Sequence, residues 1–128
     1  MKRIKPGGKM AVLAMIIAAV LLTVEETNAE PIRMHLTCYC PESCPGTITY
    51  TGAHVREGIA AVTTEHIGDK ALIWTVSGDY LGCWECLDRI GTGNRSVIDV
   101  WKPDIESARE MMRLTGGRVM VSFVGEPE

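Results

Sequence analysis

The stretch W-E-C-L-D-R-I-G-T-G-N-R-S-V-I-D-V-W, residues 84–101, carries the strongest structural signal in this 128-residue chain. It contains two apolar runs, one with Asp88 and one with Asp99, and a turn rich in Gly, Thr, Asn and Arg between them. Two strands joined by a glycine-bearing loop would bring both carboxylates to one mouth of a sheet. Paired carboxylates are the groups that acid–base chemistry on sugars requires. The stretch therefore predicts a sheet that carries a candidate acid–base pair.

The flanking sequence predicts further short strands and one helix. Asp104, directly after Pro103, can cap a helix by accepting hydrogen bonds from its first free amides, and Gly116-Gly117 would end that helix. Residues 47–51 are β-branched and aromatic, which favours a short strand or an extended arm. Alternating or continuous apolar runs predict strands over residues 32–39, 59–62, 71–76, 80–87, 96–101 and 119–124. Together these elements indicate a mainly β protein, a compact barrel or sandwich with one short helix near the C-terminus.

The first 29 residues have the pattern of a secretory signal peptide. Four basic residues precede the apolar run 10–24, and Ala29 is a small residue at the expected cleavage site. The run is shorter than the ~18 residues of a spanning helix, although a retained membrane anchor stays open as the alternative. We therefore expect a secreted or cell-envelope protein whose mature part is residues 30–128.

The charge of the mature part argues against one class of partner. Four of the thirteen basic residues lie in the predicted signal, so acidic residues outnumber basic ones in the remainder. Nucleic-acid phosphates require a cationic face, so we expect no nucleic-acid partner. A neutral or sugar-like substrate is compatible with this charge, and no cofactor is predicted.

All five cysteines lie in the mature part, at positions 38, 40, 44, 83 and 86. In an exported chain they would be disulfides or free thiols, and an odd count leaves at least one without an intramolecular partner. The alternative is a zinc site, because two cysteine clusters can supply four thiolates to one ion. Its ligands would be Cys38, Cys40, Cys83 and Cys86.

Three segments of the chain together resemble the three-aspartate (3D) domain of Firmicute and phage cell-wall proteins and of the membrane-bound lytic transglycosylase A family. They are G-I-A-A-V at 58–62, L-D-R-I-G-T-G-N-R-S-V-I-D-V-W at 87–101, and the helix and last strand that follow. The family motif, D-T-G-G-A-I-K-G-x-x-I-D, places its two aspartates eleven positions apart, and Asp88 and Asp99 keep that separation. The resemblance covers residues 54–124. It divides the chain into a signal (1–29), a Cys-rich strand and turn (30–53) and a barrel (54–128).

The resemblance implies a double-psi β-barrel that acts on the glycan strands of peptidoglycan. Asp99 matches the catalytic acid of the transglycosylase family, which protonates the glycosidic oxygen and then takes a proton from the C6 hydroxyl of the sugar. Asp88 matches a partner that positions or polarises the site. Independently of the resemblance, the apolar neighbours of Asp99 would raise its pKa, and Arg89 would keep Asp88 ionised. The simpler interpretation is that each aspartate only caps a turn or pairs with an arginine.

Four further residues are candidates for substrate contact. Trp84 and Trp101 stand beside the aspartates and could stack on sugar rings, although core packing is the commoner role of Trp in a strand. Tyr50 and Thr51 resemble a segment that precedes the barrel in the family and would line its groove. Where the family has its first aspartate, this chain has Thr63. That difference favours the alternative function, a non-catalytic carbohydrate-binding barrel of the cell wall.

Overall fold

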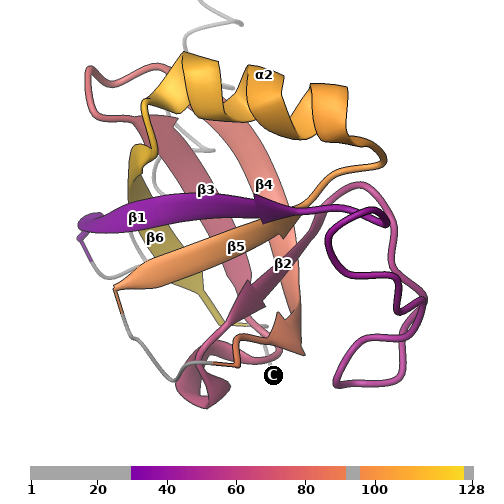
Figure 1. Cartoon of the computed structure of the whole chain (residues 1–128). Helices are drawn as coiled ribbons and strands as arrows, with labels where there is room; N and C mark the ends of the chain where they lie inside the picture. The colour runs from indigo at the N-terminus through magenta and orange to yellow at the C-terminus, as the bar shows by residue number, and fades with distance from the viewer. Residues whose placement is uncertain (1–29, 92–95, 126–128) are drawn as a thin grey trace, which may run out of the picture.

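The computed structural model describes residues 30–91 and 96–125, which form a barrel with a helix across one end (Figure 1). Within these residues six strands close into the barrel, in the order β1-β5-β2-β4-β3-β6. The elements in chain order are β1 (Ile32–Tyr39), β2 (Ile59–Val62), the 3₁₀ helix η1 (Thr64–His66), β3 (Lys70–Thr75), β4 (Tyr80–Arg89), β5 (Val97–Trp101), α2 (Ile105–Thr115) and β6 (Arg118–Val124). The predicted class, a mainly β small barrel with one short helix near the C-terminus, is confirmed.

The strand pairing has an internal two-fold pattern. β1 pairs with β5 in parallel, and β2 pairs with β4 in parallel. The other four neighbouring pairs are antiparallel. Exchanging β1, β2 and β3 with β4, β5 and β6 reproduces the same set of pairs, so each half of the chain supplies a parallel partner to the other. This is the interlocked arrangement expected of the predicted double-psi barrel.

The core lies inside the barrel and follows the two-residue period of the strands. Met34 and Leu36 point inward from β1, and Ile98 and Val100 point inward from β5. β2 is buried along its whole length, as its continuous I-A-A-V run predicts. Each large apolar side chain buried in this way contributes roughly 1.5–3 kcal/mol relative to an exposed one. The outward residues of β5, which include Asp99, are therefore held on a rigid wall.

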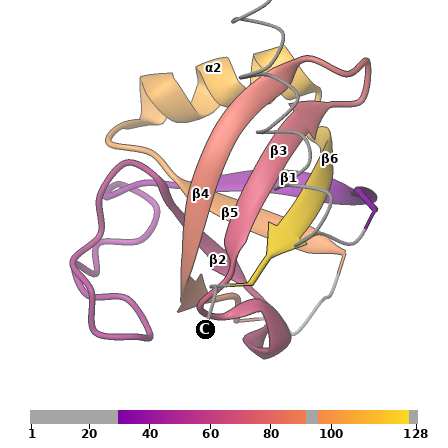
Figure 2. The same cartoon turned by 180° about the vertical axis from the view of Figure 1, so that it is seen from behind.

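Helix α2 begins and ends where the sequence predicts. The Asp104 carboxylate accepts a 2.7 Å hydrogen bond from the amide of Ser107, and Gly116 closes the helix with a left-handed φ of 65°. Figure 2 shows the opposite side of the barrel, where β4, β3 and β6 run side by side below α2. The predicted segment 47–51 is neither a regular strand nor extended throughout. Ile48 forms an isolated bridge with His54, and the chain between them turns, with the Gly52 amide donating a 3.0 Å hydrogen bond to the Thr49 carbonyl.

The barrel starts earlier in the chain than the resemblance implies. β1 pairs with both β5 and β6, so the barrel begins at Ile32 and the segment 30–53 is not a separate unit. The wall would be open between β5 and β6 without this strand. The predicted signal peptide, residues 1–29, lies outside the described residues. Among the residues that are described, no helix has the length and apolar character needed to cross a bilayer.

Candidate acid–base site

The two aspartates occupy one row across three neighbouring strands. Asp99 on β5 and Asp88 on β4 are both in register with Ala61 on β2, the strand between them. Thr37 on β1 extends the row on the other side of Asp99. Neighbouring strands are about 4.8 Å apart, which places the Cα atoms of the two aspartates roughly 10 Å from each other. The small side chain of Ala61 fills little of the space between them.

Asp99 lies on the outer surface of the barrel in a partly buried position. Its neighbours Ile98 and Val100 are fully buried in the interior, so the alternation of the strand turns Asp99 outward. The Thr37 hydroxyl donates a 2.9 Å hydrogen bond to Asp99 Oδ1. Burial raises the pKa of Asp99 and the charge of Asp88 adds to this, whereas the Thr37 hydrogen bond opposes it. The direction agrees with the expectation from the apolar neighbours, and it suits a proton donor.

Asp88 has much richer hydrogen bonding. Its Oδ2 accepts a 3.0 Å hydrogen bond from the Tyr39 hydroxyl. Its Oδ1 accepts from the amides of Tyr50, at 2.9 Å, and Arg89, at 3.0 Å. Three donors around one carboxyl group match the acceptor-only chemistry of an ionised carboxylate. The guanidinium of Arg89 lies 4.8 Å from the centre of the Tyr50 ring, and the hydrogen bond from Arg89 to Asp88 comes from its backbone amide.

Tyr39 and Thr37 are two functional residues that the sequence interpretation missed. Both lie on the outer face of β1, two residues apart, and each hydrogen-bonds one of the aspartates. Burial and the charge of Asp88 raise the pKa of Tyr39, so its hydroxyl remains a donor. Their two-residue spacing predicts that they share one face of the strand. The parallel pairing of β1 with β5 is what shows that this face is the one that carries Asp99.

The candidate sugar-contact residues divide into two groups. Trp84 is a correction, because its ring is only 7% exposed and packs in the barrel core, where it cannot stack on a sugar. Trp101 lies two residues beyond Asp99 on the outer face and is half-buried, and its Nε1 is buried without a hydrogen-bond partner among the described residues. Tyr50 is 57% exposed beside Asp88. Thr51 is exposed and donates a 2.8 Å hydrogen bond to the carbonyl of Leu87.

Thr63, which stands at the position of the family's first aspartate, is buried directly after β2. It lies two residues beyond Ala61, and its hydroxyl contacts Glu65 Oε1 at 3.4 Å. It contributes no ionisable group to the row of aspartates. Gly93, in the turn between the two aspartates, lies outside the described residues.

The cysteines do not form the alternative zinc site. All five are free thiols, and no group of three or more His, Cys, Asp or Glu side chains in residues 30–91 and 96–125 is arranged to hold a metal ion. On β4, Cys83 is exposed whereas Cys86 is buried in the core, so the two thiols face opposite sides of the strand. Burial raises the pKa of Cys86 to about 12 and that of Cys38 to about 11, so neither is a thiolate at neutral pH.

No protein-family model matches the chain, and the search of curated proteins finds no match either. The resemblance to the 3D domain therefore stays a prediction from its motif, and the function has to be argued from the site itself.

Proposed function

We propose that this chain is an exported enzyme that cleaves the glycan strand of peptidoglycan, as a lytic transglycosylase or glycosidase of the cell envelope. One observation carries the proposal. Asp99, whose pKa is raised, lies in the same row as Asp88, which accepts three hydrogen bonds, and Ala61 lies between them. Two carboxyl groups in contrasting environments are the arrangement that acid–base chemistry on a glycosidic bond needs.

In the proposed reaction Asp99 acts first as an acid and then as a base. The protonated carboxyl group gives its proton to the glycosidic oxygen as the bond from that oxygen to the anomeric carbon breaks. The resulting Asp99 carboxylate, which still accepts from Thr37, then takes the proton of the sugar's C6 hydroxyl. The C6 oxygen closes on the anomeric carbon and yields a 1,6-anhydro end. The Asp88 carboxylate stabilises the positive charge that develops on the sugar ring.

The surroundings of Asp88 supply a surface for the sugar. Tyr50 is held by its own amide to Asp88, and its exposed ring is backed by the guanidinium of Arg89. Exposed aromatic rings beside a catalytic carboxylate can pack against the apolar face of a pyranose. Trp101 lies on the same outer face as Asp99 and offers part of a second ring.

The test is digestion of purified sacculi with residues 30–128, which include the complete barrel, followed by mass spectrometry of the soluble products. We expect anhydro-muropeptides, and we expect Asp99→Asn to lower their rate of release by about 100-fold or more. Asp79→Asn is the matched control, because Asp79 is exposed in the turn before β4, far along that strand from Asp88.

Other products would lead to other conclusions. Release of reducing ends instead of anhydro ends would identify a hydrolase, with water as the nucleophile. Binding to sacculi without any product would contradict the enzymatic proposal. It would support a carbohydrate-binding barrel, the function that Thr63 favours.

A further inference from the structure

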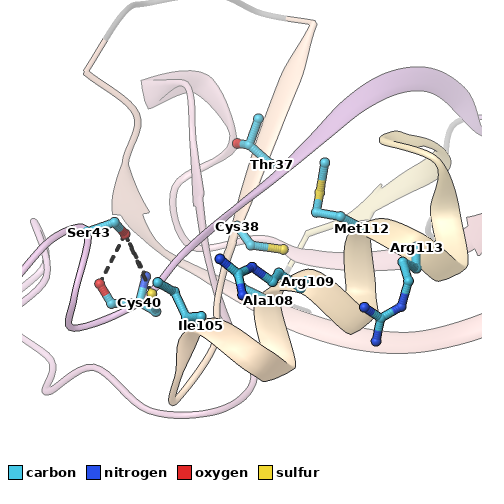
Figure 3. A pocket seen from close by; sticks show the side chains of 9 residues that line it. All are labelled: Thr37, Cys38, Cys40, Ser43, Ile105, Ala108, Arg109, Met112 and Arg113. Atoms are coloured by element: carbon cyan, nitrogen blue, oxygen red, sulfur yellow. Dashed lines mark hydrogen bonds between the residues drawn. The ribbon is translucent and has the colours of Figure 1, made fainter.

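A pocket of about 620 Å³ includes Thr37, the residue that hydrogen-bonds Asp99, in its lining. Figure 3 shows the side chains that line this pocket. It lies between the end of β1, the turn that follows it, and helix α2. Ile105, Ala108 and Met112 form its wall on the helix. This volume suits a ligand of the size of a short peptide, and most of the lining is apolar.

The charged residues of the pocket are all cationic. Arg109 and Arg113 line it, and no aspartate or glutamate does. The Arg113 guanidinium forms an ion pair with Glu110 Oε1 at 2.6 Å. Arg109 forms no ion pair within the described part of the chain. In Figure 3 the Arg109 guanidinium extends toward Cys38 and Cys40, and Arg113 points away from them. An arginine with free donors at an apolar pocket is a binding group for a carboxylate.

The Cys38 thiol of the pocket does not oppose an anion. The pKa of Cys38 is raised to about 11, chiefly by burial, so at neutral pH this thiol carries no negative charge. Cys40 is buried and its sulfur lies 3.7 Å from the Ser43 hydroxyl. A thiol is in addition only a weak hydrogen-bonding partner.

The pocket adjoins the proposed acid through one residue. Thr37 lines the pocket, and its hydroxyl donates to Asp99 Oδ1 at 2.9 Å. The charge of Asp99 is also close enough to Cys38 to affect the pKa of that thiol. A ligand group in the pocket would therefore lie next to a sugar bound over Asp99.

We propose that this pocket is a substrate subsite for the peptide that substitutes the muramic acid of peptidoglycan, with Arg109 binding a peptide carboxylate. The proposal rests on the proposed function, because the peptide belongs to the glycan strand that would bind over the aspartates. The aliphatic side chains of the peptide pack on Ile105, Ala108 and Met112, and the carboxylate pairs with the free guanidinium. Arg109 is then a specificity residue that acts in binding, not in the chemical step.

The experiment compares Arg109→Gln with Arg118→Gln on two substrates, glycan strands with their peptides and strands from which an amidase has removed them. On the peptide-bearing strands we expect Arg109→Gln to raise KM by about tenfold with kcat nearly unchanged, as for loss of one charge-assisted contact. On the stripped strands we expect no difference from the parent protein. Arg118→Gln, which removes the same charge from an exposed residue of β6 that does not line the pocket, is expected to have little effect on either substrate.

A second measurement separates this proposal from the function on which it rests. Binding of muramyl dipeptide, followed by NMR shifts of α2 amides, is expected to weaken in Arg109→Gln and to persist in Asp99→Asn. If the parent protein cleaves glycan but Arg109→Gln treats both substrates alike, the subsite is wrong and the enzyme stands. If no glycan is cleaved and muramyl dipeptide still binds through Arg109, the enzyme is wrong and the subsite stands. Absence of dipeptide binding to the parent protein would overturn the subsite directly.

Discussion

Asp88 and Asp99 share one row of the barrel but differ in almost everything around them. Asp99 lies in the middle of β5, where two paired strands hold its backbone and a single hydroxyl from Thr37 meets its carboxyl group. Asp88 lies near the end of β4, where three donors converge on it. A proton donor needs an environment that disfavours the charged form of the carboxyl group, and a fixed carboxylate needs an environment that stabilises the charged form. The difference indicates which of two chemically identical groups can give up a proton.

The two regions also differ in what holds them in place. Asp99 is positioned by the pairing of its own strand, so its location survives changes in nearby side chains. Asp88 instead joins β4 to the arm formed by residues 40–58, through the amide of Tyr50. Asp88 therefore stabilises structure as well as charge, and the two aspartates are expected to respond differently to mutation.

The largest expected effect on stability comes from Asp88→Ala. This change removes the acceptor of three hydrogen bonds and leaves the hydroxyl of the buried Tyr39 without this partner. We expect the free energy of unfolding to fall by about 2–3 kcal/mol, measured by denaturant titration. Because the Tyr50 amide loses its acceptor, we also expect its hydrogen exchange to become much faster.

Tyr39→Phe is the matched control, since it removes one of the three bonds and keeps the ring. It is expected to cost about 1 kcal/mol and to leave exchange at Tyr50 nearly unchanged. Equal protection of the Tyr50 amide in Asp88→Ala and in the parent protein would show that the arm is held by other contacts. The claim that Asp88, unlike Asp99, holds this segment to the barrel would then be wrong.

The sequence predicted the local parts of this comparison and missed the non-local ones. The strand around Asp99, the capping role of Asp104 and the end of α2 at Gly116 follow from patterns within a few residues, and all are confirmed. The partners of the aspartates, Thr37 and Tyr39, stand 62 and 49 residues away along the chain. Parallel pairing of distant strands sets these contacts, and no local spacing encodes which strands will pair.

The role of Trp84 was open in the sequence for a related reason. The alternation of β4 places Trp84 and Cys86 on one face, but the choice between core and surface depends on how the barrel closes. Closure turns that face inward. Arg109 was not singled out at all, because an arginine on the exposed side of a short helix has no distinctive pattern until a pocket forms beside it.

A smaller effect is expected from Asp99→Asn on stability, and its sign depends on pH. The folded-state pKa of Asp99 is raised by burial, so its protonated form contributes fully below the ordinary value of 3.8. That contribution is lost as the pH rises through the folded-state pKa, because a partly buried carboxylate must then form. Asparagine cannot ionise, so the stability of the variant is expected to increase relative to that of the parent protein as the pH rises through the folded-state pKa of Asp99.

Urea titrations of the two proteins at low and at neutral pH check this prediction. The same titrations of Asp79→Asn, which changes an exposed carboxylate in the turn before β4, serve as the control. A stability difference between Asp99→Asn and the parent protein that does not change with pH would mean that Asp99 bears no charging cost in the fold. Its selection as the proton donor would then lack its physical basis.

The smallest effect tests the link between Thr37 and Asp99. The Thr37 hydroxyl stabilises the Asp99 carboxylate and so lowers its pKa against the effect of burial. Thr37→Val keeps the shape of the side chain but removes the donor, so the pKa of Asp99 rises further. Because cleavage needs the protonated acid, the fall in kcat at the basic side of the pH profile is expected to move to higher pH, with little change at the optimum. Thr37→Ser retains the hydroxyl and is expected to keep the parent profile. Movement of the Thr37→Val profile to lower pH would contradict the assignment, since it would mean that the hydroxyl stabilises the neutral acid and that the two aspartates differ for another reason.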